Sequence, residues 1–263
     1  MADRPRLWPV FAAYAGAFAA IVVLSILAAG VVRSLYPDLP EPAVFEGLPG
    51  LLAGGIASST ALLLTTLIAS RGRPLAGLRL VPGRETGRAL AFMVVGMLAL
   101  GQTLDSLTML AGLGQQGSMV AIRRALAQAA GPDLFLAVLV IGGLAGTAEE
   151  VFFRAYMQTR LVERVPPGAA VIIASVCFGV LHLEWLHALL ALALGLYLGW
   201  ITELTGSALP AVACHVINNA LFTILTASWG TLDGLAINAA LATVGALAFT
   251  GCVVWLRHVG PTR

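Results

Sequence analysis

Eight long apolar segments limit what this sequence can fold into. A helix needs about 20 mostly apolar residues to cross the hydrocarbon layer of a bilayer, and segments near that length recur along the whole chain. They lie at about residues 8–32, 48–70, 88–112, 133–160, 168–186, 188–204, 209–227 and 233–257. The sequence therefore predicts an all-α, polytopic membrane bundle of about eight transmembrane helices. We treat residues 1–263 as one membrane domain.

The composition excludes the main soluble classes. Hydrophobic residues make up 59% of the chain and charged residues 11%, whereas soluble domains average about 45–50% and about 25%. A soluble protein of this size could not bury so much apolar surface, so we exclude a soluble enzyme, a disordered chain and a nucleic-acid-binding protein. The cysteines Cys177, Cys214 and Cys252 all fall in apolar segments, which predicts no disulfide framework.

Arginine placement predicts the orientation of the bundle. All 15 basic residues are Arg and none is Lys, which we interpret as bacterial codon bias. Cytoplasmic loops carry an excess of basic residues. If loops alternate sides from the N-terminus, eleven arginines fall on the first side, three on the second, and Arg154 within a span. This imbalance favours eight spans in the inner membrane with both termini cytoplasmic. The first side holds Arg4, Arg6, Arg71, Arg73, Arg79, Arg84, Arg88, Arg160, Arg164, Arg257 and Arg263, and the second holds Arg33, Arg123 and Arg124.

The fourth segment carries three charged side chains within six residues. Glu149, Glu150 and Arg154 lie in TAEEVFFRAYMQ, where a charge costs at least about 2.5–3.5 kcal/mol on insertion scales and usually faces a functional cavity. Residues four apart share a helix face, so Glu150 and Arg154 are expected to pair. Glu149 is rotated by about 100° and is left free to face something else. The alternative is a structural ion pair beside one protonated glutamate.

Two later segments carry polar side chains at the same i, i+4 spacing. Phe178 and His182 share a face in CFGVLHLEWLH, and His215 and Asn219 share one in SALPAVACHVINNA, with Asn218 close by. Taken alone, His182 is typical of an interfacial histidine. The histidine and asparagines of the other segment, taken alone, are typical of hydrogen bonding between helices.

Other polar positions receive weaker interpretations. GQTLDS places Asp105 at depth in the third segment, where it could line a cavity, support a site or mark a bend. Glu184 and His187 look like the polar rim of the fifth segment. Residues 114–131 are expected to include a short interfacial helix. Two glycine pairs have the spacing of close helix packing, and we interpret them as contacts only: Gly142 and Gly146, and Gly195 and Gly199.

Glu149, His182, His215 and Asn219 together indicate attack of an activated water on an amide. A carboxylate and an imidazole can polarise the water, and a second imidazole with an amide can donate hydrogen bonds to an oxyanion. No serine or cysteine is clearly placed as a nucleophile. Glu149, His182 and His215 are also acceptable ligands for a catalytic zinc, although the sequence has no HExxH helix.

Three motifs in this order resemble those of a known family. Glu149-Glu150-x-x-x-Arg154, then Phe178-x-x-x-His182, then His215-x-x-x-Asn219 are similar to the motifs of the CAAX-processing and bacteriocin-processing proteases (CPBP, also called Abi). The resemblance covers about residues 133–225, and the three segments within residues 1–132 match only in being hydrophobic. One departure is Ala155, where the family often has Gly after the Arg.

The resemblance implies a glutamate-dependent intramembrane endopeptidase with a polar cavity and a protein or peptide substrate at the membrane. It implies that Glu149 and His182 activate the water, and that His215 and Asn219 hold the oxyanion. Zinc is an alternative cofactor, since the family is often labelled metalloprotease. The remaining motif positions would support the site or bind substrate: Glu150, Arg154, Phe178 and Asn218.

Two other functions compete with this prediction. Some relatives are immunity or scaffold proteins, so a non-catalytic bundle of the same fold is the main alternative. A proton-coupled transporter using Glu149 and Glu150 as a relay is a weaker one, because transporters usually show inverted repeats or paired broken helices. The sequence shows neither of these features.

One difficulty of depth remains for the proposed site. His182 is predicted about 21 Å along the fifth segment from Gly168, but His215 only about 8 Å beyond Pro210 in the seventh. The two can meet only if the helices tilt strongly or the seventh helix begins inside the bundle. We therefore predict that TGSALP, just before and including Pro210, dips into the protein.

Overall fold

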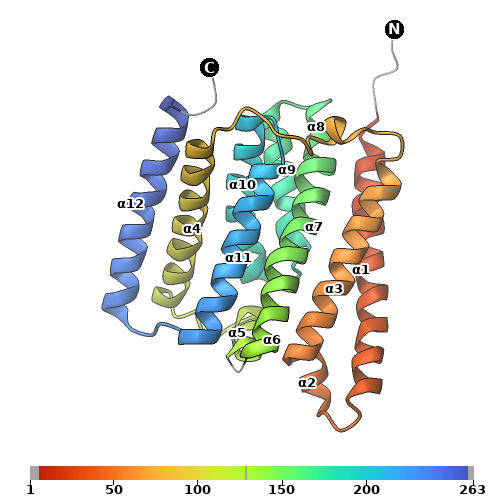
Figure 1. Ribbon diagram of the computed structural model, residues 1–263, viewed down its shortest axis with the longest axis vertical. Coiled ribbons are helices and arrows are strands. Elements are labelled where there is room, and N and C mark those ends of the chain that lie inside the picture. The colour runs from red at the N-terminus through yellow and green to blue at the C-terminus, as the bar shows by residue number, and fades with distance from the viewer. Residues whose placement is uncertain (1–5, 128, 260–263) are drawn as a thin grey trace.

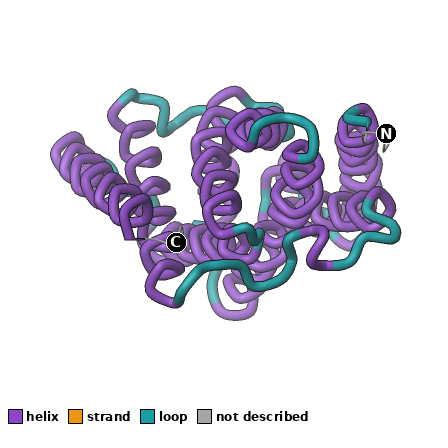
Figure 2. Tube along the Cα trace, turned by 90° about the horizontal axis from the view of Figure 1, so that it is seen from above, coloured by secondary structure: helices purple, strands orange, loops and turns teal. Residues whose placement is uncertain are grey.

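The computed structural model describes residues 6–127 and 129–259, and these residues form helices and loops without a strand (Figures 1 and 2). The prediction of an all-α bundle is confirmed. Seven of the described helices are long and apolar enough to cross a membrane. They are α1 (Trp8–Leu35), α3 (Leu48–Ala69), α4 (Gly87–Leu110), the composite helix Gly131–Val162, α10 (Trp185–Thr205), α11 (Leu209–Trp229) and α12 (Leu235–Val259).

The composite helix widens into a π-helix twice. It runs through α6 (Gly131–Ala137), the π-helix η2 (Val138–Ala145), α7 (Gly146–Glu150), the π-helix η3 (Val151–Gln158) and α8 (Thr159–Val162). The sequence predicts one ordinary helix here, because the residues are mostly apolar and their spacing gives no sign of a wider turn. π-turns inside α-helices are frequent at functional sites, and here two of them flank Glu149 and Glu150.

The predicted fifth span is shorter than expected. α9 covers only Pro167–Val180, which is 14 residues or about 21 Å, so the predicted range 168–186 is wrong at its end. The helix stops because the chain turns at Leu183, whose φ is 60°. Glu184 then caps α10 by accepting hydrogen bonds from the backbone N–H groups of Leu186 and His187, both at 2.9 Å.

Three short helices occupy the connections. α5 (Ser118–Leu126) lies within the predicted interfacial range 114–131. It begins after Gly117, whose φ of 73° suits glycine. α2 (Glu41–Glu46) and the 3₁₀-helix η1 (Leu75–Leu78) lie in segments that the sequence analysis leaves as loops.

The long helices surround the composite helix. α4 packs against α12 on one side of the bundle and α1 against α3 on the other, with α9, α10 and α11 between them (Figure 1). The start of α1 and the end of α12 lie at one end, and α5 and α6 at the opposite end (Figure 1). In place of the predicted eight spans, the described residues contain seven helices of spanning length and the shorter α9. Arg4 and Arg263, which entered the orientation argument, lie outside the described residues.

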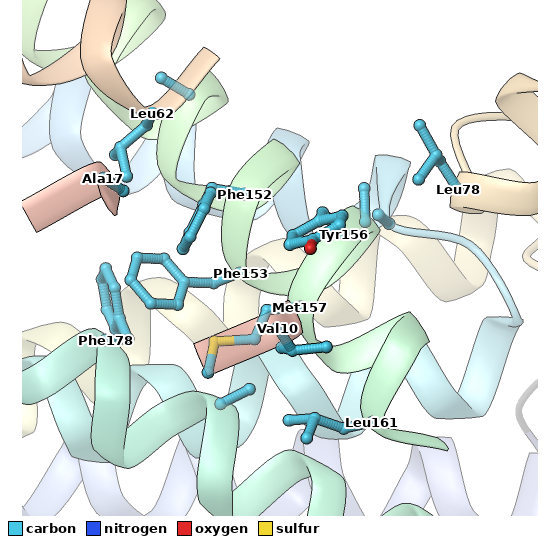
Figure 3. Close-up of a cluster of buried hydrophobic side chains, with 14 of the residues drawn as sticks. Val10, Ala17, Leu62, Leu78, Phe152, Phe153, Tyr156, Met157, Leu161 and Phe178 are labelled. Atoms are coloured by element: carbon cyan, nitrogen blue, oxygen red, sulfur yellow. The ribbon is translucent and has the colours of Figure 1, made fainter. Parts of the chain in front are cut away.

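A buried apolar cluster fixes the composite helix in the bundle. Phe152, Phe153 and Tyr156 of η3 lie between α3 and α9, where they meet Leu62 and Phe178 (Figure 3). The rings of Phe153 and Phe178 meet edge to face with centroids 5.2 Å apart. These contacts hold the turn that carries Glu149 and Glu150 against α9, the helix that leads to His182.

Candidate active site

His215 of α11 lies between the two adjacent carboxylates of α7. Its Nδ1 lies 2.8 Å from Glu150 Oε1, and its Nε2 lies 3.6 Å from Glu149 Oε2. A carboxylate oxygen accepts, so Nδ1 carries the hydrogen and donates to Glu150. The Glu150 side chain is fully buried, whereas that of Glu149 is 21% exposed. Glu149 is therefore the carboxylate that can reach a water or a substrate.

Arg154 forms an ion pair with Glu150, the buried member of the glutamate pair. Its Nε lies 3.2 Å from Glu150 Oε2, with both side chains fully buried, as the i, i+4 spacing predicts. Its Nη2 donates to the carbonyl of Gly195 at 3.3 Å. The guanidinium also lies over the Phe178 ring, 5.0 Å from the centroid. A buried charge is tolerated when it is paired and hydrogen-bonded, and these contacts anchor Glu150.

The glycine pairs bring the helices close enough for these contacts. A Cβ on Gly142 would lie 3.0 Å from Ala220, and one on Gly146 would lie 3.3 Å from the backbone nitrogen of Val216, both in α11. On α10, a Cβ on Gly195 would lie 3.3 Å from Arg154 Nη2. Predicted as a helix contact, the pair Gly142 and Gly146 also places α11 beside α7, so that His215 reaches both glutamates.

The recess predicted for TGSALP is present. Ser207 and Ala208 are fully buried beneath the loop between α3 and α4. The Ala208 N–H donates to the Arg79 carbonyl at 2.9 Å, and the Ser207 hydroxyl donates to the Val81 carbonyl at 2.7 Å. α11 therefore starts below a covering loop, inside the protein, as the sequence analysis predicts.

His182 lies just past the end of α9, beside Phe178. Its Nδ1 lies 2.9 Å from the Phe178 carbonyl oxygen. A carbonyl can only accept, so Nδ1 carries the hydrogen, and neutral His182 presents Nε2 as an acceptor. The Phe178 ring stands between the two histidines, with centroids 5.1 Å from His182 and 5.9 Å from His215. Phe178 thus sets the orientation of both imidazoles.

One cavity of about 560 Å³ joins these groups. Glu149, His182, His215 and Asn219 all line it, together with Asn218. Asn219 donates from Nδ2 to the Ile141 carbonyl at 3.4 Å, and Asn218 donates to Asn219 Oδ1 at 3.3 Å. The volume lies within the range of about 300–1,000 Å³ that small-molecule and cofactor sites occupy, so part of a peptide could enter it.

The three motifs therefore reach one cavity from three parts of the fold. Residues 131–221 match the family described as type II CAAX prenyl endopeptidase Rce1-like. The match confirms the resemblance seen in the motifs, over 91 of the 263 residues. No curated protein and no solved structure matches the chain.

The Rce1-like segment contains every motif residue but not the whole cavity. It begins at the start of α6 and ends in α11, two residues after Asn219. α3, α4 and α5 precede the segment, and all three contribute cavity walls. Their lining residues include four glycines and three polar side chains: Gly50, Gly54, Gly55, Gly101, Ser58, Gln102 and Asp105. The N-terminal helices thus shape the space next to the Rce1-like motifs.

The zinc alternative requires three ligands that the structure does not assemble. Among residues 6–127 and 129–259, no group of three His, Cys, Asp or Glu side chains is arranged to hold a metal ion. In the suggested set of Glu149, His182 and His215, each histidine donates from Nδ1 to a protein acceptor and keeps Nε2 open, so the arrangement of the three side chains, and not their hydrogen bonds, decides against the set. The residues do not fit the metal in this arrangement, and we derive no step through it.

Two contacts near the site were missed by the sequence analysis. His187, predicted at a polar rim, lies on the cavity wall, with its ring centroid 4.2 Å from that of His182. Its Nδ1 lies 3.1 Å from Ser118 Oγ of α5. The break between α9 and α10 separates the two histidines in the chain, so helical spacing could not join them. The bond from His215 to Glu150 was also missed, because no local pattern links residues 65 positions apart.

Proposed function

We propose that this protein is an intramembrane endopeptidase that hydrolyses a peptide bond near the terminus of a membrane-associated protein or peptide. At the family level, the Rce1-like match and seven helices of membrane-spanning length support a CAAX protease-type membrane enzyme. The observation that carries the finer proposal is the meeting of Glu149, His182, His215 and Asn219 in one cavity.

Glu149 and His182 would activate the water. Glu149 is the exposed member of the glutamate pair, so its carboxylate can take a proton from a water in the cavity. His182 presents Nε2 as an acceptor, because Nδ1 is used on the Phe178 carbonyl. A water bound between these two acceptors is oriented with its oxygen lone pair free to attack a carbonyl carbon.

His215 and Asn219 would stabilise the oxyanion that forms on attack. As an imidazolium, His215 donates from Nδ1 to Glu150 and still has Nε2–H to offer. The Asn219 amide has a second hydrogen beyond the one directed at Ile141. Such preorganised donors act strongly in a site that excludes bulk water. Glu149 would then pass its proton to the departing amine, which balances the hydrolysis.

Cleavage of a quenched fluorescent peptide library by the purified protein in lipid vesicles tests the proposal. We expect Glu149→Gln and His182→Ala each to lower the rate by about 10²-fold or more, as loss of general-base catalysis does. Glu163→Gln is the matched control, because Glu163 pairs with Arg73 outside the cavity and should keep the wild-type rate.

The outcomes separate the enzyme from the scaffold alternative. Equal cleavage by wild type and both site variants would reject the mechanism. If no peptide is cleaved and Glu149→Gln complements a deletion strain as well as wild type, the non-catalytic scaffold hypothesis replaces the peptidase proposal.

A further inference from the structure

The cavity has a second polar end that the proposed chemistry does not use. Asp105 of α4 lines it there, beside Met119 and Ile122 of α5. Asp105 Oδ1 forms an ion pair with Arg123 of α5. Arg123 also donates to the Gly114 carbonyl at 3.3 Å, and it does not line the cavity.

At the end that carries Asp105, the cavity wall offers a carboxylate and no arginine. Among the described residues, Asp105 and Glu149 are the only Asp or Glu side chains on the wall, and no arginine lines it. Asp105 is 37% exposed, and only its Oδ1 takes a hydrogen bond within the described part of the chain. Its Oδ2 is therefore a carboxylate oxygen with room for a donor. An apolar cavity with an anion at this end suits a cation and disfavours a second anion.

The spacing between the two ends corresponds to a short stretch of peptide. α4 and α11 both run from the end of the bundle that carries the chain termini toward the end that carries α5 (Figure 1). A Cβ on Gly101 would lie 2.7 Å from Asn218, so these residues share a level. Leu98 is then level with His215, and Asp105 lies seven residues further along α4, or about 10 Å. An extended peptide covers that distance in about three residues.

We propose that Asp105 forms a specificity subsite for a lysine or arginine side chain about three residues from the scissile bond. This inference rests on the proposed peptidase function. The apolar stem of such a side chain would lie against Met119 and Ile122, with its charged head at Asp105 Oδ2, as long basic side chains commonly arrange themselves. The substrate class is thus an apolar peptide segment with one basic residue near the cleavage site.

Peptide binding tests the subsite separately from cleavage. The protein carries Glu149→Gln to prevent turnover, and fluorescence anisotropy gives Kd for alanine–leucine peptides with Lys, norleucine or Glu at the third position on either side of one central bond. We expect the Lys peptide to bind about tenfold more tightly than the norleucine peptide at one of the two positions, and the Glu peptide most weakly. Adding Asp105→Asn should remove the preference without weakening norleucine binding.

Arg123→Gln is the variant that distinguishes a subsite from a structural ion pair. It removes the competing cation and leaves the Asp105 charge, so the preference for Lys should increase. If Asp105→Asn and Arg123→Gln have the same effect, or if Lys and norleucine peptides bind equally well, the proposal is overturned. If the preference depends on Asp105 but the wild type cleaves no peptide, the subsite stands and the peptidase function fails. Thermal unfolding of both variants checks that they are folded.

Discussion

His215 and Glu150 share a buried hydrogen bond that joins α11 to α7, with Nδ1 and Oε1 2.8 Å apart. The second oxygen of Glu150 lies 3.2 Å from Arg154 Nε. One carboxylate therefore fixes the orientation of an imidazole and compensates a buried guanidinium. Replacing Glu150 would therefore change the orientation of His215 even though Glu150 does not contact the substrate.

Replacing Glu150 with Leu should lower both stability and activity. The Arg154 charge would stay fully buried without a partner, and breaking a buried pair in this way costs about 3–5 kcal/mol. His215 would also lose the acceptor of its Nδ1. Thermal unfolding in detergent and the peptide cleavage rate measure the two effects.

The double variant Glu150→Leu/Arg154→Met separates the effect on stability from the effect on activity. Replacing both members of a buried pair by apolar residues is often neutral for stability, so the melting temperature should recover while the cleavage rate stays low. A double variant with wild-type activity would show that Glu150 does not position His215.

Gly142→Leu should lower the melting temperature and the cleavage rate much more than Gly143→Leu. A Cβ on Gly142 would lie 3.0 Å from Ala220 of α11, whereas the nearest atom to a Cβ on Gly143 is a Leu139 side-chain carbon at 3.8 Å. Overpacking costs about 1–3 kcal/mol, and a shift of α11 by about 1 Å would lower the rate by about 10²-fold through His215. Cleavage rates and melting temperatures of the two variants check this. Similar values for both would mean that the close approach at Gly142 does not position α11.

The sequence was sufficient for the helices but not for their irregular parts. Apolar length located every long helix, and the i, i+4 rule paired Glu150 with Arg154. The end of α9 was missed, because the turn at Leu183 contains neither glycine nor proline and the polar residues around it were interpreted as the rim of a longer helix. The two π-helices were missed because the apolar surface around η2 and η3 gives no signal when a turn widens.

The site was predictable as a set of residues but not as a set of contacts. The motifs selected Glu149, His182, His215 and Asn219, and all four line the cavity. That His215 is held by Glu150, and that His187 lies next to His182, depends on packing between distant helices. Asp105 had three open interpretations, and only the cavity decides that it is a wall residue.

Glu203→Ala should destabilise the fold more than Glu163→Ala. Glu203 Oε1 accepts from Gln158 at 2.8 Å and from Arg79 at 2.6 Å, beneath the loop that covers the start of α11. Removing it leaves a buried Gln158 amide with one partner fewer, at a cost of about 1–3 kcal/mol. Glu163 forms more exposed pairs with Arg73 and Arg160, which contribute about 0–1 kcal/mol each. Denaturation midpoints of the two variants give the comparison, and equal midpoints would contradict the role given to Glu203.

Cysteine labelling should place Asp38 and Arg71 on opposite sides of the membrane. Both residues are exposed, one after α1 and the other after α3. The excess of arginine on the Arg71 side predicts that this side is cytoplasmic. In intact cells, a membrane-impermeant maleimide should label Asp38→Cys but reach Arg71→Cys only after permeabilisation. The wild type, whose three cysteines lie within helices, is the background control. The reverse pattern would invert the orientation.

Chelator treatment should leave the cleavage rate unchanged. In the described part of the chain, no three candidate ligands are arranged to hold a metal ion. The proposed chemistry needs only Glu149 and the neighbouring histidines and asparagine to move protons and hold charge. Initial rates before and after incubation with 1,10-phenanthroline, together with the metal content of the same sample, measure this. A loss of activity that Zn²⁺ restores, in a protein that carries stoichiometric zinc, would mean that Glu149, His182 and His215 rearrange to bind the metal, and the water would then be activated by zinc.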